Sequence, residues 1–271
     1  MKSGTIGNID FISFGSGSKV LVILPGLGDS LRSIQGTAIP MSVAYRMFTK
    51  EYTVYMFGRK HNLPEGSTTR DMASDLNSAL EALEIYKADV MGVSMGGMIA
   101  QWLAIDFPEM VRKLVLVVTT SKPHAVLTEA LTEWMDCARR NDHEAFMESN
   151  LRRIYTEEYC EKYKWLVPFM GKFTQPKSYD RFLVQAHACF EHRSAEYLDR
   201  ISAPTLVIGG EQDKSISAEE SRYLAEKIPG ACLYMYQNLG HGLYDEAKDF
   251  QRRIFRFLTA KETEVEQGLT K

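Results

Sequence analysis

The sequence predicts an α/β protein, in which a mostly parallel, twisted sheet carries helices on both faces and a helical insertion. Three observations support this fold class. Short apolar runs recur along the chain, segments with helical periodicity separate them, and this alternation stops between residues 121 and 200. The 271 residues are sufficient for one large domain with such an insertion.

The apolar runs are short and nearly uninterrupted, which is typical of strands buried on both faces of a sheet. They lie at Phe11–Phe14, Val20–Leu24, Thr53–Phe57, Ala88–Val93, Leu114–Val118, Thr205–Ile208 and Cys232–Tyr236. The first run is followed by Gly15–Ser18, a segment of glycine and serine that predicts a turn. We therefore expect each run to form a strand.

Segments with apolar residues at every third or fourth position fill the gaps and predict amphipathic helices. They lie at Met72–Leu83, Gly97–Phe107, Ala218–Ile228 and Asp245–Leu258. Strands that alternate with helices form mostly parallel sheets, because each crossover helix packs back on one face.

Between residues 121 and 200, helical patterns follow one another without a convincing strand: Leu127–Arg139, Ala145–Tyr155, Glu157–Val167 and Tyr179–Phe190. We predict that residues 1–120 and 201–271 form the core, and that residues 121–200 form a helical cap over the carboxyl edge of the sheet. The large side chains of this insertion suit either a substrate pocket or the core of the cap. They are Trp134, Phe146, Trp165, Phe169, Met170 and Phe173.

The composition narrows the class of partner. A net charge of -3 and a pI of about 6.1 give no argument for binding to nucleic acid or to an anionic membrane. No apolar run reaches the roughly 18 residues that a membrane helix needs, and the N-terminus lacks the apolar core of a signal peptide. The 4 cysteines lack metal-ligand spacing, so we expect reduced thiols in a cytoplasmic protein. We expect its partner to be a small-molecule substrate.

The segment Gly92–Gly97 combines the end of a strand, a sharp turn and the start of a helix, with Ser94 at the turn. Such a turn lifts the serine hydroxyl clear of the sheet edge. Gly92 and Gly96 allow the strand and the helix to pass closely, and the helix N-terminus favours developing negative charge. The pattern predicts that Ser94 is a nucleophile.

Ser94 needs a base, and His241 is the best candidate. His241 lies between two glycines just after the last apolar run, Cys232–Tyr236, and should therefore lie at the same edge of the sheet as Ser94. The flanking glycines would let the imidazole approach the serine.

The base needs an acid that orients its ring and stabilises the imidazolium. Asp213 follows the run Thr205–Ile208 and should lie at the same edge, one strand away. Glu211 is the nearest alternative, whereas Asp245 lies too close to His241 in sequence to be favoured.

An oxyanion hole completes the predicted site. The turn Pro25–Gly28 directly follows the run Val20–Leu24, so it can direct a backbone N–H group at the site. We predict that Leu27 supplies this donor and that Met95, the residue after the nucleophile, supplies the second. Each such donor contributes about 3–4 kcal/mol to transition-state stabilisation.

In this order, the motifs resemble the α/β-hydrolase superfamily over nearly the whole chain. The matching segments are Leu24–Gly28, Gly92–Gly97, Gly209–Asp213 and Gly240–Gly242. The short four-helix insertion is similar to the cap of the 3-oxoadipate enol-lactonase-like and related small carboxylesterase groups. Many relatives have His-Gly where this chain has Pro25-Gly26, but the donor is a backbone group, so we expect the mechanism to survive.

The residues and the resemblance together imply a serine hydrolase that cleaves a carboxylic ester, lactone or thioester through an acyl-enzyme, with no metal or organic cofactor. Two alternatives stay open: hydrolysis of a carbon–carbon bond in a diketone, and a non-catalytic ligand receptor that retains the triad. The sequence also leaves open whether the chain is a monomer or a homodimer.

Overall fold

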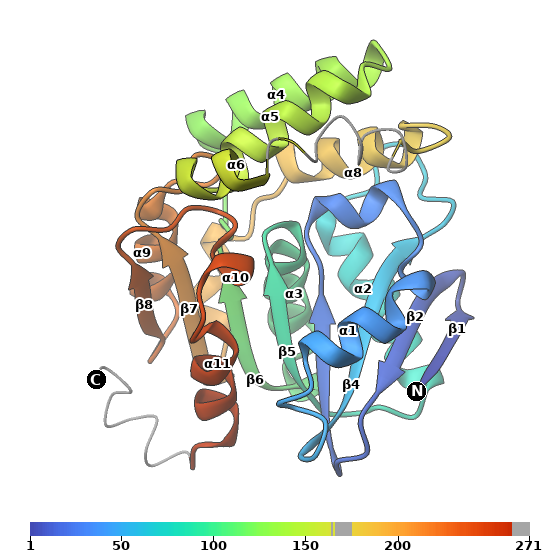
Figure 1. Ribbon diagram of the computed structural model, residues 1–271. Coiled ribbons are helices and arrows are strands. Elements are labelled where there is room, and N and C mark those ends of the chain that lie inside the picture. Colours follow the sequence, from blue (N-terminus) through green and yellow to red (C-terminus); the bar gives the residue numbers. More distant parts are fainter. Residues whose placement is uncertain (164, 166–174, 262–271) are drawn as a thin grey trace.

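A single twisted sheet runs through the middle of the molecule (Figure 1). The structure is a computed structural model that describes residues 1–163, 165 and 175–261. Within those residues the sheet has 8 strands in the order β1-β2-β4-β3-β5-β6-β7-β8. Their bounds are Lys2–Ile6 (β1), Ile9–Phe14 (β2), Lys19–Leu24 (β3), Tyr52–Lys60 (β4), Ala88–Val93 (β5), Val111–Val117 (β6), Thr205–Gly210 (β7) and Cys232–Tyr236 (β8).

The sheet is parallel from β4 to β8, while β1 and β2 are antiparallel at one edge. A two-residue turn joins β1 to β2, and both of its residues, Gly7 and Asn8, have positive φ, as hairpin turns of this length require. Strand β1 was absent from the sequence prediction because its residues are mostly polar or small and exposed.

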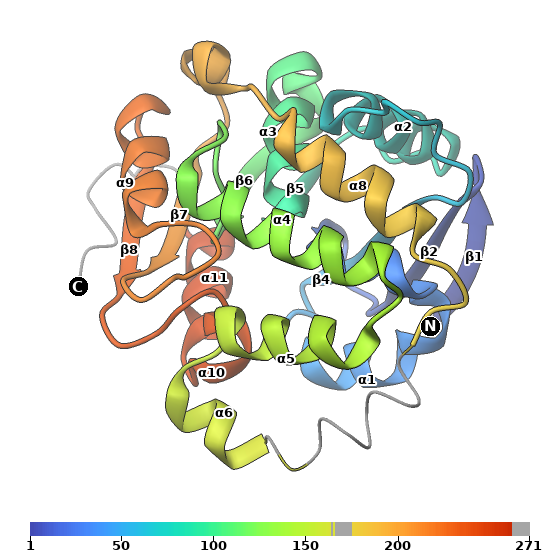
Figure 2. The same ribbon diagram turned by 90° about the horizontal axis from the view of Figure 1, so that it is seen from above.

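Helices cover both faces of the sheet, as predicted (Figures 1 and 2). On one face lie α2 (Thr69–Ala82), α3 (Met95–Asp106) and α9 (Ala218–Lys227), and on the other lie α1 (Ala38–Ala44) and α11 (Phe250–Thr259). Neighbouring residues of β5 point to opposite faces, so Val90 packs in the first of these two cores and Met91 in the second.

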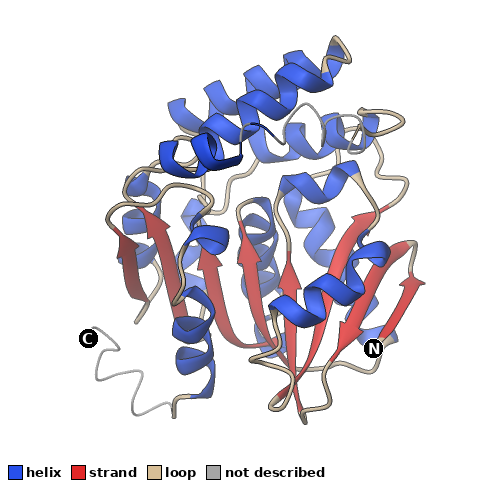
Figure 3. Ribbon diagram, viewed as in Figure 1, coloured by secondary structure: helices blue, strands red, loops and turns tan. Residues whose placement is uncertain are grey.

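Four further helices lie across the carboxyl ends of the parallel strands, where the arrowheads of Figure 3 point. We call them the upper helices: α4 (Ala125–Arg139), α5 (His143–Ile154), α6 (Glu157–Tyr163) and α8 (Asp180–Phe190). The sequence predicted a helix over Glu157–Val167. Beyond Tyr163, that range consists of residues that lie outside the described part of the chain, except for Trp165. No helix in the described ranges is both long and apolar enough to cross a membrane.

The predicted helix Asp245–Leu258 is confirmed from Phe250 onward but is not continuous before that residue. The chain instead forms α10 (Leu243–Glu246) and then α11, with an extended residue, Ala247, between them. Tertiary contacts override the helical pattern here, because Tyr236 donates a hydrogen bond to Asp249 at 2.8 Å and holds the connection against β8.

Several short helical segments were not predicted, because each is only about one or two turns long and gives little periodicity. Besides α1, which contains Pro40, they are η1 (Leu27–Leu31), η2 (Ile34–Thr37), η3 (Pro108–Met110) and η5 (Ala195–Arg200).

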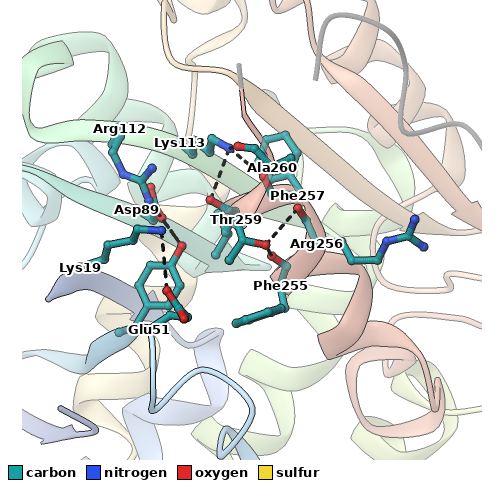
Figure 4. Close-up of polar contacts among 12 residues, drawn as sticks. Lys19, Glu51, Asp89, Arg112, Lys113, Phe255, Arg256, Phe257, Thr259 and Ala260 are labelled. Atoms are coloured by element: carbon teal, nitrogen blue, oxygen red, sulfur yellow. Dashed lines mark hydrogen bonds and ion pairs between the residues drawn. The ribbon is translucent and has the colours of Figure 1, made fainter. Parts of the chain in front are cut away.

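Charged side chains are buried at the amino edge of the sheet (Figure 4). Asp89 pairs with Arg112 and accepts a hydrogen bond from the Tyr52 hydroxyl at 2.9 Å. Burial raises the pKa of Asp89 although Arg112 favours the ionised form. The Lys113 ammonium donates to the carbonyl oxygens of Phe257 and Ala260, at 2.8 and 2.7 Å, and so fixes the carboxyl end of α11.

Candidate active site

Ser94 lies in the sharp turn between β5 and α3. Its φ of 53° and ψ of -120° place it in a region that non-glycine residues rarely adopt. The turn is held on both sides, since the Ser94 N–H donates to the Val117 oxygen at 2.9 Å and the Thr119 hydroxyl donates to the Ser94 oxygen at 2.7 Å. The neighbouring strand β6 therefore stabilises the strained residue.

The glycines around Ser94 are required by close backbone packing. A Cβ atom on Gly96 would lie 2.1 Å from the Leu24 carbonyl oxygen, and one on Gly92 would lie 2.4 Å from the Gly96 carbonyl oxygen. No side chain fits at either distance. The interpretation of Gly92 and Gly96 as close-approach positions agrees with these distances.

His241 and Asp213 are brought together from two loops at the carboxyl edge. The His241 Nδ1 atom lies 2.8 Å from Asp213 Oδ2, and His241 is only 5% exposed. The N–H groups of Ser215 and Ile216 donate to Asp213 Oδ1, both at 2.8 Å. Both carboxylate oxygens are therefore engaged, and Nε2 is the imidazole nitrogen left to serve a hydroxyl group.

The other acids that were considered have different partners. Glu211 pairs with Arg222 on the solvent side of the loop. Asp245 accepts a hydrogen bond from the Tyr155 hydroxyl at 2.8 Å. Of the candidate acids, Asp213 is therefore the one that the structure places on the His241 ring.

A cavity of about 390 Å³ lies between the carboxyl edge of the sheet and the upper helices, and both Ser94 and His241 line it. Trp134 and Phe146 extend into its wall from α4 and α5. Trp165, by contrast, is 71% exposed. Phe169, Met170 and Phe173, which were also candidates for the pocket, lie outside the described residues.

Of the two predicted oxyanion donors, Met95 directly follows Ser94 in the chain and Leu27 lines the same cavity as Ser94. Leu27 begins the short helix η1 and lines the cavity. Met95 is the first residue of α3, where backbone N–H groups have no carbonyl partner within the helix. Gly26 brings the turn close to the serine, since a Cβ atom there would lie 3.3 Å from the Ser94 Cβ.

Arg59 is a residue of this site that sequence reasoning missed. From the end of β4, its buried guanidinium donates to the Pro25 carbonyl oxygen at 2.5 Å and to the Phe57 carbonyl oxygen at 3.2 Å. It thus fixes the turn Pro25–Gly28, which is the turn predicted to supply an oxyanion donor. The local sequence offers only a cationic residue two positions after the apolar run Thr53–Phe57, which does not indicate the contact with Pro25.

The end of α5 packs against the loop that carries His241. The Gly242 N–H donates to the Ile154 carbonyl oxygen at 2.6 Å. A Cβ atom on Gly242 would lie 2.5 Å from the Tyr155 ring, which explains why glycine follows the histidine. The upper helices therefore contact the histidine loop directly.

Comparisons with known proteins identify the family of this fold. The family model of the alpha/beta hydrolase fold matches residues 19–248. A proposed carbamate hydrolase, RutD of Pseudomonas syringae, is 24% identical over 230 residues, which cover 79% of this chain and 86% of that protein. The 3-oxoadipate enol-lactonase 2 of Acinetobacter baylyi is 26% identical over 226 residues, which cover 81% of each protein.

Among solved structures, the enol-lactonase of Burkholderia xenovorans superposes with a TM-score of 0.79 at 20% identity, covering 93% of this chain and 96% of that one. The fold class and the superfamily predicted from the sequence are both confirmed. This chain belongs to the α/β-hydrolase family.

Proposed function

We propose that this α/β hydrolase is a serine hydrolase that cleaves a carboxylic ester, lactone or thioester of a small molecule. One observation carries the proposal: the strained Ser94 lines the same cavity as His241, and Asp213 holds the His241 ring at 2.8 Å. A nucleophile, a base and an orienting acid are the parts that acyl transfer requires.

In the proposed reaction, Ser94 Oγ attacks the carbonyl carbon while His241 Nε2 takes the hydroxyl proton. Asp213 stabilises the imidazolium, and the N–H groups of Leu27 and Met95 stabilise the oxyanion. The bond to the leaving group then breaks as His241 returns the proton to that group. Water activated by His241 finally hydrolyses the acyl-enzyme and releases the acid.

Esters, lactones and thioesters are favoured over amides because their leaving groups need less protonation. The relatives support hydrolysis of an acyl bond, since one is named as an enol-lactonase and another as a proposed carbamate hydrolase.

A fluorophosphonate probe tests the proposal, because it labels only an activated serine. We expect an adduct on Ser94 at neutral pH and turnover of a p-nitrophenyl ester. A chain that binds small molecules but forms no adduct would be a receptor. Labelling of Ser94 with cleavage of a diketone and not of the matched ester would instead support a carbon–carbon hydrolase.

We further propose that residues 121–200 act as a cap that shapes the substrate cavity. The lining side chains Trp134 and Phe146, which come from this stretch, support that role. The cytoplasmic location stays a prediction from the sequence, and the choice between monomer and homodimer stays open.

A further inference from the structure

The cavity that holds Ser94 has mostly apolar walls, formed by side chains such as Leu27, Met41, Phe146 and Phe182. Among the described residues that line it, none is lysine or arginine. A negatively charged group of a substrate would therefore lose its water there without gaining a cation from these walls.

Asp245 lines the same cavity, from the short helix α10 that follows the His241 loop. Its Oδ2 atom accepts the hydrogen bond from Tyr155 at 2.8 Å, which favours the ionised carboxylate. Asp245 is also exposed to solvent, although partial desolvation of its carboxyl group by the surrounding protein raises the pKa of Asp245. The rings of Tyr45 and Tyr244, which also line the cavity, offer further contact to a cation.

The size of the cavity places any bound charge within reach of Asp245. A sphere of 390 Å³ is about 9 Å across. At that distance, one charge changes the binding of another by about twofold at the dielectric constant of water and by about twentyfold at an effective dielectric constant of about 20, and an exposed carboxylate lies between these limits. The effect applies whichever end of the substrate carries the charge.

We propose that Asp245 makes the site select its substrates by charge. The site takes acyl compounds that are neutral or cationic in the part that enters the cavity, and it rejects anionic ones. The proposal rests on the function proposed above and narrows its substrate class. Its basis is one solvent-exposed carboxylate that lines a cavity with mostly apolar walls, and the described lining of that cavity contains no lysine or arginine.

Three p-nitrophenyl esters of equal chain length test this proposal: the hexanoate, the adipate monoester with its terminal carboxylate, and the 6-(trimethylammonio)hexanoate. Measurement at pH 8 keeps Asp245 ionised. We expect kcat/KM for the anionic ester to be about tenfold below that for the neutral ester. We expect the cationic ester to match or exceed the neutral one, and added salt to reduce these differences.

The variant Asp245→Asn keeps the shape and removes the charge. We expect it to bring the kcat/KM values for the anionic and neutral esters within about threefold of each other. Glu158→Gln is the matched control, because it removes the same charge from an exposed position of α6 that does not line the cavity. This control should retain the wild-type ranking.

The outcomes separate the two proposals. If no ester is hydrolysed and Ser94 is not labelled, the proposed function fails. If the hexanoate is hydrolysed but the three esters react equally, the assignment to Asp245 is overturned. It is also overturned if Asp245→Asn leaves the wild-type ranking intact.

Discussion

The two ends of strand β5 use buried polar groups in opposite ways. At the amino end, Asp89 is completely buried and is bound by Arg112 and Tyr52. At the carboxyl end, Ser94 is held in a strained conformation and faces a cavity. The first arrangement satisfies a charge within the protein, and the second presents a hydroxyl group to a ligand.

The buried polar groups at the amino end of β5 therefore contribute to stability, whereas those at its carboxyl end present groups for the proposed reaction. The hydrogen bonds around Ser94 and Asp213 fix backbone and ring positions and leave the serine hydroxyl and one imidazole nitrogen for the substrate. The partners of Asp89 and Lys113 are protein groups that join the sheet to its surroundings. Substitutions at the two ends should therefore affect different measurements.

The largest expected effect is that of Ser94→Ala at the carboxyl end. Turnover of a p-nitrophenyl ester should fall by roughly 10⁴- to 10⁶-fold, because the nucleophile is lost. The thermal unfolding midpoint should change little or rise, since alanine keeps the fold. Substantial turnover in the purified variant would refute the assignment of the nucleophile.

Asp89→Asn tests the amino end. Removing one partner of a buried ion pair costs about 3–5 kcal/mol, and the 33% exposure of the Arg112 side chain places the expected loss at the lower limit. The free energy of unfolding, measured in urea, should fall by about 3 kcal/mol while kcat stays within about twofold. The double variant Asp89→Asn with Arg112→Met should recover part of this loss. A loss of kcat in the folded variant would contradict the view that the amino end of β5 contributes to stability alone.

His192 tests whether every buried polar group near the carboxyl edge serves the reaction. It is buried near that edge but does not line the cavity. Its ring nitrogens contact the hydroxyl groups of Thr69 and Ser194, at 2.8 and 3.1 Å. Burial is the main cause that lowers the pKa of His192 to about 3. Between about pH 3 and the ordinary value near 6.5, the unfolded chain therefore binds one proton more than the folded chain.

It follows that the stability contributed by neutral His192 is present above about pH 6.5 and is lost as the pH falls toward 3. The slope should reach about 1.4 kcal/mol per pH unit. His192→Gln should flatten the free energy of unfolding between pH 4 and 6.5, as measured by urea titrations. An identical slope in the variant would show that His192 does not titrate on unfolding.

The smallest expected effect is that of Tyr155→Phe, which removes the hydroxyl group bound to Asp245. One hydrogen bond contributes about 0.5–1.5 kcal/mol, so stability should fall by about 1 kcal/mol. We expect kcat to fall about threefold because α10, which follows the His241 loop, loses one contact with the end of α5, with KM for a neutral ester nearly unchanged. A large loss of stability without any change in kcat would show that Tyr155, like Asp89, contributes to stability and not to turnover.

The sequence predicted the regular strands well where an apolar run had clear limits. Ala88–Val93 and Cys232–Tyr236 match β5 and β8 residue for residue, because both runs are buried or half-buried and end at turns. The polar edge strand β1 and the short helix α1 gave no such signal. The helix predicted over Asp245–Leu258 started too early, because a contact with β8 decides where α11 begins.

The residues of the candidate site likewise fall into those that the sequence indicates and those that only the structure shows. Ser94 and His241 carry local motifs, so the chain alone indicates them, and the pairing of Asp213 with His241 followed from strand order. The roles of Arg59 and Asp245 depend on packing between segments far apart in the sequence. No local pattern records such contacts, and the three-dimensional structure was needed to find them.

The contact between α5 and the histidine loop limits how this enzyme can be re-engineered. Arg153 donates to the Lys214 carbonyl oxygen at 3.3 Å, and the Ile154 oxygen accepts from Gly242 at 2.6 Å, so one short segment touches the loops of both Asp213 and His241. The upper helices are therefore not an exchangeable module. Chimaeras that graft them from a relative should keep residues 153–156 of this chain, or rebuild both loops together with the graft.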